Sequence, residues 1–189
     1  MANPLIDPVL PKELASRGQH IEFKGKVGEL GRLAEIVEAD LAALSEERRP
    51  HGWQAAPFET RLEFGWAEGP QRIPTINGRI VAQIPAVCQR CLEAFELTLD
   101  ASIRMLLVGP NAEPGEMPDL AEFEIWELDE RTLRPLDIVE ESLVMAIPLA
   151  PRHESEESCV ALENEVAESG PEMAHPFADL RSQIDESNK

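Results

Sequence analysis

The sequence contains no tyrosine, and aromatic residues make up only 5% of its 189 residues. It has no apolar run long enough to span a bilayer, and its first residues lack the basic and apolar segments of a secretory signal. Its three cysteines are an odd number, which favours free thiols or metal ligands in a reducing compartment over a disulfide scaffold. These absences predict a cytoplasmic protein with no membrane association.

Motifs of the common enzyme classes are absent as well. The chain contains no G-x-S-x-G, no P-loop and no G-x-G-x-x-G. Its many carboxylates cluster in polar stretches, where a solvated carboxylate is the ordinary outcome. We therefore predict that the protein is not an enzyme.

Basic residues are scarce in the second half of the chain. Residues 1–104 carry 12 Lys/Arg against 15 Asp/Glu, and residues 105–189 carry 5 against 21, a balance of −16 out of a total of −19. Such a charge repels phosphates, so a general nucleic-acid-binding field is excluded and no binding to DNA is expected. Two interpretations remain for the acidic half: a solubilising tail, or a docking surface for a basic partner such as a ribosomal protein.

The length and the hydrophobic fraction of 43% are sufficient for one domain with a core of its own. We expect an extended, proline-containing arm at 1–19, a single α+β domain at 20–159, and an acidic, flexible tail at 160–189. Residues 110–131 hold several Pro and Gly among eight carboxylates and are expected to form an acidic loop with a short strand near Phe123 and Ile125.

Alternating apolar residues predict the strands. Residues 95–107 are apolar at every odd position and mostly polar at the even ones, which is typical of a strand with one buried face. Similar patterns occur around Phe23, from Phe58 to Trp66, and from 80 to 84, with a turn or bulge expected at Asn77-Gly78. The pattern predicts an antiparallel sheet with a long hairpin.

Helical spacing of apolar residues predicts two main helices. The first covers roughly 29–46 and ends before Pro50. The second begins at Pro135, whose missing N–H is tolerated in a first helical turn, and ends before Pro148. The overall expectation is an α+β fold in which these two helices pack on the sheet.

The pair Cys88 and Cys91 lies between the two longest predicted strands, at the expected hairpin tip. Two thiolates at this spacing can bind one metal ion, and a structural zinc site needs four ligands. His153 and Cys159 follow the second helix and would complete a three-sulfur, one-nitrogen site that ties the hairpin tip to the end of that helix. The alternative is that Cys88 and Cys91 are free thiols in a turn, unrelated to the other two residues.

The sequence allows two further roles for this region. A thiol oxidoreductase is the less favoured one, because the pair is not at a helix N-terminus and Glu93 and Glu96 should raise the pKa of a thiolate. Contact with RNA or another partner is the second, through a local arginine patch on the β region, with Arg79, Arg90 and Arg104 as candidates.

Several of these segments together resemble the YceD family of large ribosomal RNA subunit accumulation proteins. The shared features follow in order: Gly78 in a β-rich stretch, Cys-x-Arg-Cys-Leu at 88–92, an alternating strand, Asp-x-Val-Glu-Glu-x-Leu-x-x-Ala-x-Pro-Leu-x-Pro at 137–151, His153, Cys159, and His-Pro-Phe-Ala-x-Leu at 175–180. The resemblance covers about 20–160 plus the last segment. Family members commonly have a shorter interval between the histidine and the last cysteine than the five residues found here.

The resemblance implies a role in accumulation of large-subunit rRNA in bacteria and plastids, linked with production of a small basic ribosomal protein. It carries over no catalytic residues. The leading hypothesis is therefore a non-enzymatic factor for 23S rRNA accumulation or large-subunit assembly. The alternative is an acidic escort for a small basic ribosomal protein.

Overall fold

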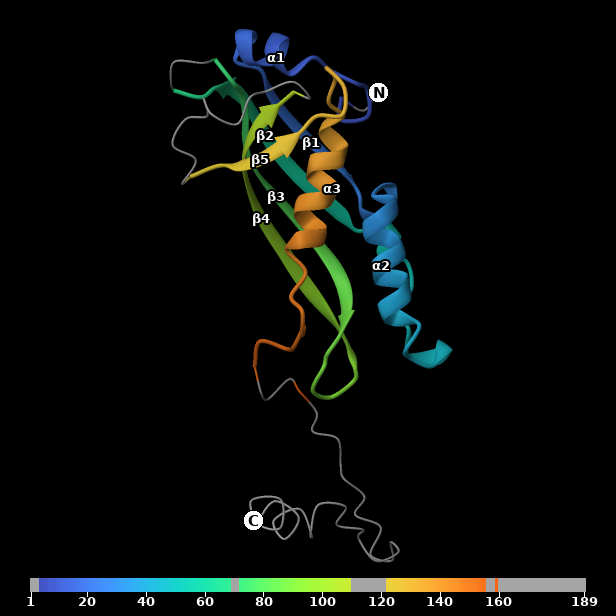
Figure 1. Ribbon diagram of the computed structural model, residues 1–189. Coiled ribbons are helices and arrows are strands. Elements are labelled where there is room, and N and C mark those ends of the chain that lie inside the picture. The colour runs from blue at the N-terminus through green and yellow to red at the C-terminus, as the bar shows by residue number, and fades with distance from the viewer. Residues whose placement is uncertain (1–3, 69–71, 110–121, 156–158, 160–189) are drawn as a thin grey trace, which may run out of the picture.

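The fold is built on one five-stranded sheet. The computed structural model describes residues 4–68, 72–109, 122–155 and 159. The strands lie in the order β1-β2-β3-β4-β5 (Figure 1). Their bounds are β1 His20–Lys26, β2 Pro57–Trp66, β3 Pro74–Val87, β4 Ala94–Val108 and β5 Glu124–Glu127. The first four are antiparallel neighbours, as predicted.

The last strand departs from the prediction, because β5 pairs parallel to β4. Met105 lies opposite Glu124 and Val108 opposite Glu127. A parallel neighbour needs a long connection, and the chain between Val108 and Glu124 is long enough to supply one. The sheet is thus mostly, not wholly, antiparallel.

Three α-helices are present among the described residues: α1 Pro11–Arg17, α2 Gly31–Leu41 and α3 Pro135–Met145. Short 3-10 helices occur at Val27–Glu29, Glu46–Arg48 and Trp53–Ala55. The helices α2 and α3 cover one face of the sheet, with α2 against β3 and α3 against β3 and β4. The fold is α+β with two main helices, as predicted. Within the described part of the chain, no helix has the length and apolar character needed to cross a membrane.

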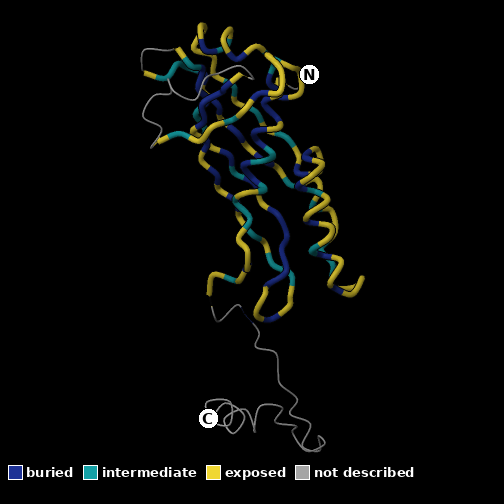
Figure 2. The backbone as a smooth tube through the Cα atoms, in the orientation of Figure 1, coloured by how far each residue is buried: buried dark blue, intermediate teal, exposed yellow. Residues whose placement is uncertain are grey.

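The core fills the space between the sheet and these two helices. The strands contribute the alternating apolar side chains that the sequence pattern predicts, and the helices contribute one apolar stripe each. Its members include Phe58, Leu62, Ile76, Ile80, Leu99 and Ile103 from the sheet and Leu33, Val37, Val139 and Leu143 from the helices. Figure 2 shows buried residues at intervals along β2, β4 and α2, as expected for elements with one buried face.

The first nineteen residues are not uniformly extended, since Pro11–Arg17 form α1. Pro11 occupies the first turn, where its ring presets the helical φ. Gly18 ends the helix in the left-handed conformation at φ 56°, and its N–H donates to the carbonyl oxygen of Ala15 at 3.1 Å. Ala15 is buried, so tertiary packing stabilises a helix too short to persist alone. The predicted tail at 160–189 lies outside the described residues.

The predicted turn at Asn77-Gly78 is wrong, because both residues lie inside β3. A Cβ atom added to Gly78 would lie 2.4 Å from the carbonyl oxygen of Arg61 on β2. The glycine is therefore required for the close approach of two strands rather than for a turn. The first main helix is also shorter than predicted: α2 ends at Leu41, and tighter turns continue the chain to Leu44.

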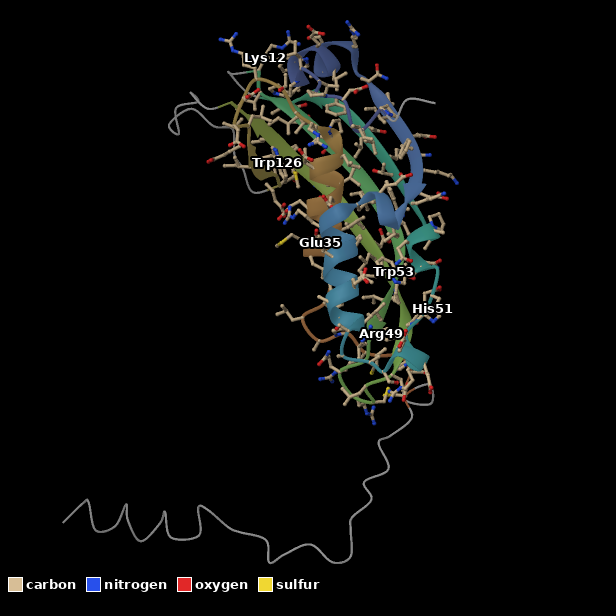
Figure 3. All side chains as sticks on the ribbon, turned by 90° about the vertical axis from the view of Figure 1, so that its right-hand side faces the viewer. Lys12, Glu35, Arg49, His51, Trp53 and Trp126 are labelled. Atoms are coloured by element: carbon tan, nitrogen blue, oxygen red, sulfur yellow. The ribbon has the colours of Figure 1, made fainter. Side chains whose placement is uncertain are left out.

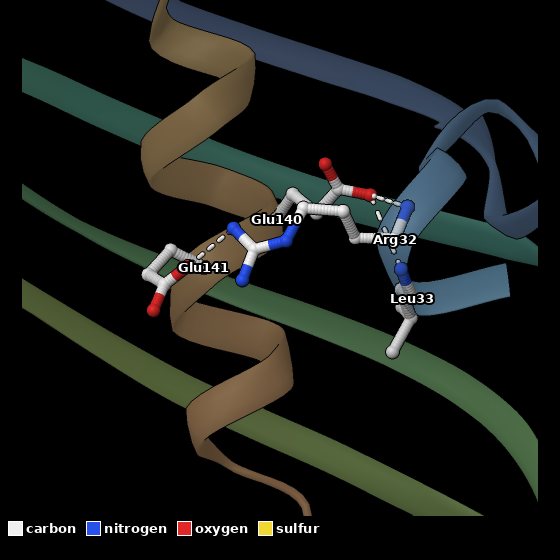
Figure 4. A network of polar contacts seen from close by, with 4 residues as sticks. All are labelled: Arg32, Leu33, Glu140 and Glu141. Carbon is white, nitrogen blue, oxygen red and sulfur yellow. Dashed lines mark hydrogen bonds and ion pairs between the residues drawn. The ribbon is translucent and has the colours of Figure 1, made fainter. Parts of the chain in front are cut away.

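The N-terminus of α2 is capped by a residue from α3. Leu30 at the N-cap makes no side-chain hydrogen bond, and an Oε1 atom of Glu140 instead accepts the N–H of Arg32 at 2.7 Å and of Leu33 at 3.2 Å. The Arg32 guanidinium also donates to Glu141 at 2.6 Å (Figure 4). Glu140 therefore satisfies two N–H groups that have no partner within their own helix.

Replacing Glu140 with alanine should lower the free energy of unfolding by about 1–2 kcal/mol, the usual cost of losing an N-terminal cap. Urea unfolding monitored by circular dichroism measures the change. Glu140→Gln keeps a carbonyl oxygen at the same place and should cost less. Equal losses in the two variants would contradict the capping role.

Candidate metal centre at the hairpin tip

The tip of the β3–β4 hairpin is a tight turn built around Cys88 and Cys91. The Cys88 N–H donates to the carbonyl oxygen of Glu93, and the Leu92 N–H donates to the carbonyl oxygen of Cys88, each at 2.9 Å. Leu92 adopts φ 57°, which is uncommon for a residue with a side chain and costs about 1 kcal/mol. The turn holds both cysteine side chains on its buried side, since Cys88 and Cys91 are 0% and 2% exposed.

The segment after α3 is bound to this tip. The Gln89 N–H donates to the carbonyl oxygen of Pro151 at 2.9 Å. The ring of His153 packs against that of Phe95, on β4, with centroids 4.7 Å apart. These contacts bring His153 and Cys159 beside the turn, as the sequence predicts.

The four predicted ligand residues come together in one cluster. The ligand atoms of Cys88, Cys91, His153 and Cys159 all lie within 4.8 Å of one another. The Sγ atoms of Cys88 and Cys159 are 3.8 Å apart, and the Cys91 Sγ is 3.6 Å from His153 Nδ1. A tetrahedral zinc ion with ordinary Zn–S and Zn–N bonds needs separations of about 3.8 Å and about 3.5 Å along these two edges. The residues thus fit a metal of this kind.

Cys88 is predisposed to be a thiolate. Burial opposes its ionisation, but backbone N–H groups of Cys91, Arg90 and His153, together with the His153 side chain, lower the pKa of Cys88 to about 5. The expectation that Glu93 and Glu96 would raise the pKa is wrong for this thiol, whose pKa is lowered. Glu93 forms an ion pair with Arg48 at 2.8 Å.

Cys159 has the opposite tendency. Burial, followed by the neighbouring Cys91 and Cys88 sulfurs, raises the pKa of Cys159 to about 11. These opposite shifts are expected for three neighbouring sulfurs without a cation. Once one thiol is ionised, its negative charge disfavours ionisation of the next. A divalent cation at the centre would relieve this repulsion and favour three thiolates.

The enclosure of the cluster indicates structural rather than catalytic chemistry. All three cysteines are buried, and a metal ion held by all four residues would have no coordination position left for a substrate. A redox enzyme also needs an accessible thiolate, whereas Cys88 is fully buried. The geometry is that of a clasp between the hairpin tip and the segment after α3.

The three candidate contact arginines do not form one patch. Arg79 and Arg104 lie on the outer face of the sheet, whereas Arg90 belongs to the hairpin tip. Arg79 makes two hydrogen bonds to Asp100, with Nε 2.7 Å from Oδ1, and lowers the pKa of that carboxyl below its ordinary range. Arg104 pairs with Glu122 at 2.8 Å.

Some residues that support the site were not predicted for that role. Arg48 donates to the carbonyl oxygen of Leu92 at 2.9 Å and so supports the tip from outside. Arg49 instead donates to the carbonyl oxygens of Leu44 and Ala42 after α2. Figure 3 places Arg49, His51 and Trp53 at this same end of the molecule. The local sequence carries no signal for the Arg48 contact, since Leu92 is 44 residues away.

Comparison with known proteins covers this part of the chain. Residues 76–182 match the model of the family described as "Large ribosomal RNA subunit accumulation protein YceD", a range that contains all four cluster residues. The chain is also 30% identical over 127 residues to the large ribosomal RNA subunit accumulation protein YceD of Haemophilus influenzae, an alignment spanning 65% of this chain and 72% of that protein. No solved structure gives a significant match.

Proposed function

Because this chain belongs to the YceD family, named for large ribosomal RNA subunit accumulation, we propose that it is a non-enzymatic factor supporting accumulation of 23S rRNA and assembly of the large ribosomal subunit. The observation that carries the proposal is the family match across residues 76–182. The enclosed cysteine–histidine cluster supports the non-enzymatic part, since a fully protein-ligated metal serves structure.

The cofactor we propose is one structural zinc ion, held by Cys88, Cys91, His153 and Cys159. The three-sulfur, one-nitrogen donor set favours zinc, and the two separations of 3.8 Å and 3.6 Å match those of a tetrahedral site. Its role would be to fix the segment after α3 against the hairpin tip.

The ribosomal role has two candidate partners: 23S rRNA itself, and a basic large-subunit protein that this chain would escort. The net charge of −16 on residues 105–189 favours the protein partner. Arg79, Arg90 and Arg104 stay candidates for contact with RNA or another partner, although Asp100 and Glu122 offset the charge of two of them. Binding to isolated 23S rRNA separates the partners, because an escort would bind the basic protein and not the RNA alone. Rising salt weakens either complex where exposed charges hold it.

Deletion of the gene tests the proposed function directly. The ratio of mature 23S to 16S rRNA should fall in the deletion strain and return to its original value when the gene is restored on a plasmid. An unchanged ratio in the deletion strain would refute the proposal.

A further inference from the structure

An apolar cleft lies between the C-terminal half of α2, the end of β3 and the segment that directly follows α3. It has a volume of about 170 Å³ and is lined mainly by Ile36, Val37, Ile84, Pro85, Ile147 and Leu149. We call it the α2–α3 cleft. A cavity of about this size accepts one bulky apolar side chain, as an apolar cavity of about 150 Å³ accepts benzene.

Apolar side chains around the cleft are exposed to an unusual degree. Ile36 is 40% exposed, Met145 is 76% exposed, and Leu149 is fully exposed. Helical spacing places Ile36 one turn after Arg32 on α2, and Met145 one turn after Glu141 on α3. The ion pair between Arg32 and Glu141 joins the two helices one turn before these apolar side chains (Figure 4 shows the ion pair). Such a gathering indicates an interaction site.

The helical layer around the cleft is acidic. Gly31–Leu41 carries three carboxylates against Arg32, and Pro135–Met145 carries three carboxylates and no Lys or Arg. Arg32 is engaged with α3, whereas Glu35 and Glu38 make no hydrogen bond or ion pair within the described part of the chain (Figure 3 labels Glu35 on α2). The layer thus presents uncompensated negative charge beside exposed apolar groups.

The outer face of the sheet has a different character. Its charges alternate in sign along and across the strands, and ion pairs join Lys24 to Glu59, Glu22 to Arg61, and Arg79 to Asp100. Charges paired in this way attract neither a cation nor an anion strongly. A cationic partner would therefore approach the helical layer.

We propose that the α2–α3 cleft is the docking site for a basic amphipathic segment of a partner protein. The segment inserts an apolar side chain between Ile36 and Leu149, and its Lys or Arg residues lie over the outer face of α2, where Glu35 and Glu38 are exposed. An RNA strand does not fit this surface, because phosphates would meet carboxylates. The inference rests on the proposed function for the partner being a basic protein, and it adds where that partner binds.

A labelled 14-residue peptide of leucine and lysine, with leucines at helical spacing, serves as the probe. Fluorescence anisotropy measures its affinity for the full chain, and a scrambled peptide of the same composition controls for net charge. We expect the scrambled peptide to bind at least tenfold more weakly. The double variant Ile36→Ser/Leu149→Ser should weaken binding of the first peptide by about tenfold or more, because both side chains line the cleft and apolar anchors dominate such interfaces. Both residues are exposed, so an unchanged circular dichroism spectrum is expected.

The charge requirement has its own matched control. Glu35→Gln/Glu38→Gln should weaken binding and reduce its salt dependence, whereas Glu68→Gln/Glu124→Gln, which removes the same charge elsewhere, should have much less effect. Equal loss in the two double variants would overturn the proposal, as would unchanged binding in the serine variant or equal binding of the scrambled peptide.

The docking proposal would also be overturned by evidence that something other than a partner protein occupies the cleft. Peptide binding that appears only in a Phe177→Ala variant would assign the cleft to the chain's own 176–180 segment. Self-association that the serine variant abolishes would assign it to a second copy. The peptide measurement involves no rRNA, so a negative result there would not contradict the proposed function. Likewise, an unchanged rRNA ratio in the deletion strain would not contradict the measured peptide binding.

Discussion

Replacing Cys88 with serine is expected to abolish metal binding and to detach the segment after α3 from the hairpin tip. Cys88 is fully buried and has its Sγ 3.8 Å from that of Cys159, so the variant loses one of four ligands at the centre of the clasp. Loss of a structural metal belongs to the small class of changes that cost on the order of 4 kcal/mol of unfolding free energy. The rest of the domain should stay folded, because the main hydrophobic core does not include the cysteine cluster.

Limited trypsin digestion can follow the detachment residue by residue. Arg152 is exposed but lies between Pro151 and His153, both of which contact the hairpin. Cleavage after Arg152 should be at least about tenfold faster in Cys88→Ser, since proteolysis follows the population of the opened state. Arg17, on α1 at the opposite end of the molecule, provides an internal control whose cleavage rate should not change. Equal acceleration at both sites would indicate global unfolding and would contradict the clasp.

Gly78→Ala is expected to be strongly destabilising although it adds only one methyl group. The new Cβ would lie 2.4 Å from the carbonyl oxygen of Arg61 and 3.3 Å from the Cα of Leu62, and neither backbone atom can move without separating β2 from β3. Overpacking costs about 1–3 kcal/mol when side chains can adjust, so we expect a loss at or above the upper end of that range. Urea unfolding measures it.

Gly65→Ala is the matched control for this prediction. Gly65 lies on β2 in the same pair of strands, yet its added Cβ would approach nothing closer than the Thr75 Oγ1 atom at 3.4 Å. The same substitution should therefore change stability little. If the two alanine variants were equally stable, close strand approach at Gly78 would not be the reason for the glycine.

The parts of the fold predicted correctly are those with a strong local pattern. The alternation across 95–107 indicated β4, and the short interval before it placed the cysteine pair at a hairpin tip. Pro135 and the apolar stripe after it indicated α3. In each case the residues that form the element also carry the periodicity that buries one of its faces.

The parts predicted incorrectly depend on contacts distant in the sequence. Asn77-Gly78 has the composition of a turn, but β2 and β4 pair with it on both sides and keep it extended. The parallel direction of β5 depends on a long connection rather than on its four residues. Glu140 caps α2 from more than a hundred positions away in the sequence, so no local motif predicts this contact.

The candidate site was predictable because ligand residues are scarce in this chain. With three cysteines and four histidines, few combinations can complete a four-ligand site around Cys88 and Cys91. The pKa of Cys88 was not predictable, since it depends on the backbone N–H groups of the folded turn rather than on the charges of its neighbours in sequence. The sequence could not indicate the opposite tendency of Cys159 either, because it arises only once the three sulfurs meet.

Elemental analysis of the purified wild-type protein tests the central claim most directly. The account predicts one zinc ion per chain, retained through gel filtration, and none in Cys88→Ser prepared in the same way. A folded wild-type protein that contains no metal and takes up no added zinc would contradict it, leaving the four residues as a cluster of free thiols and a histidine.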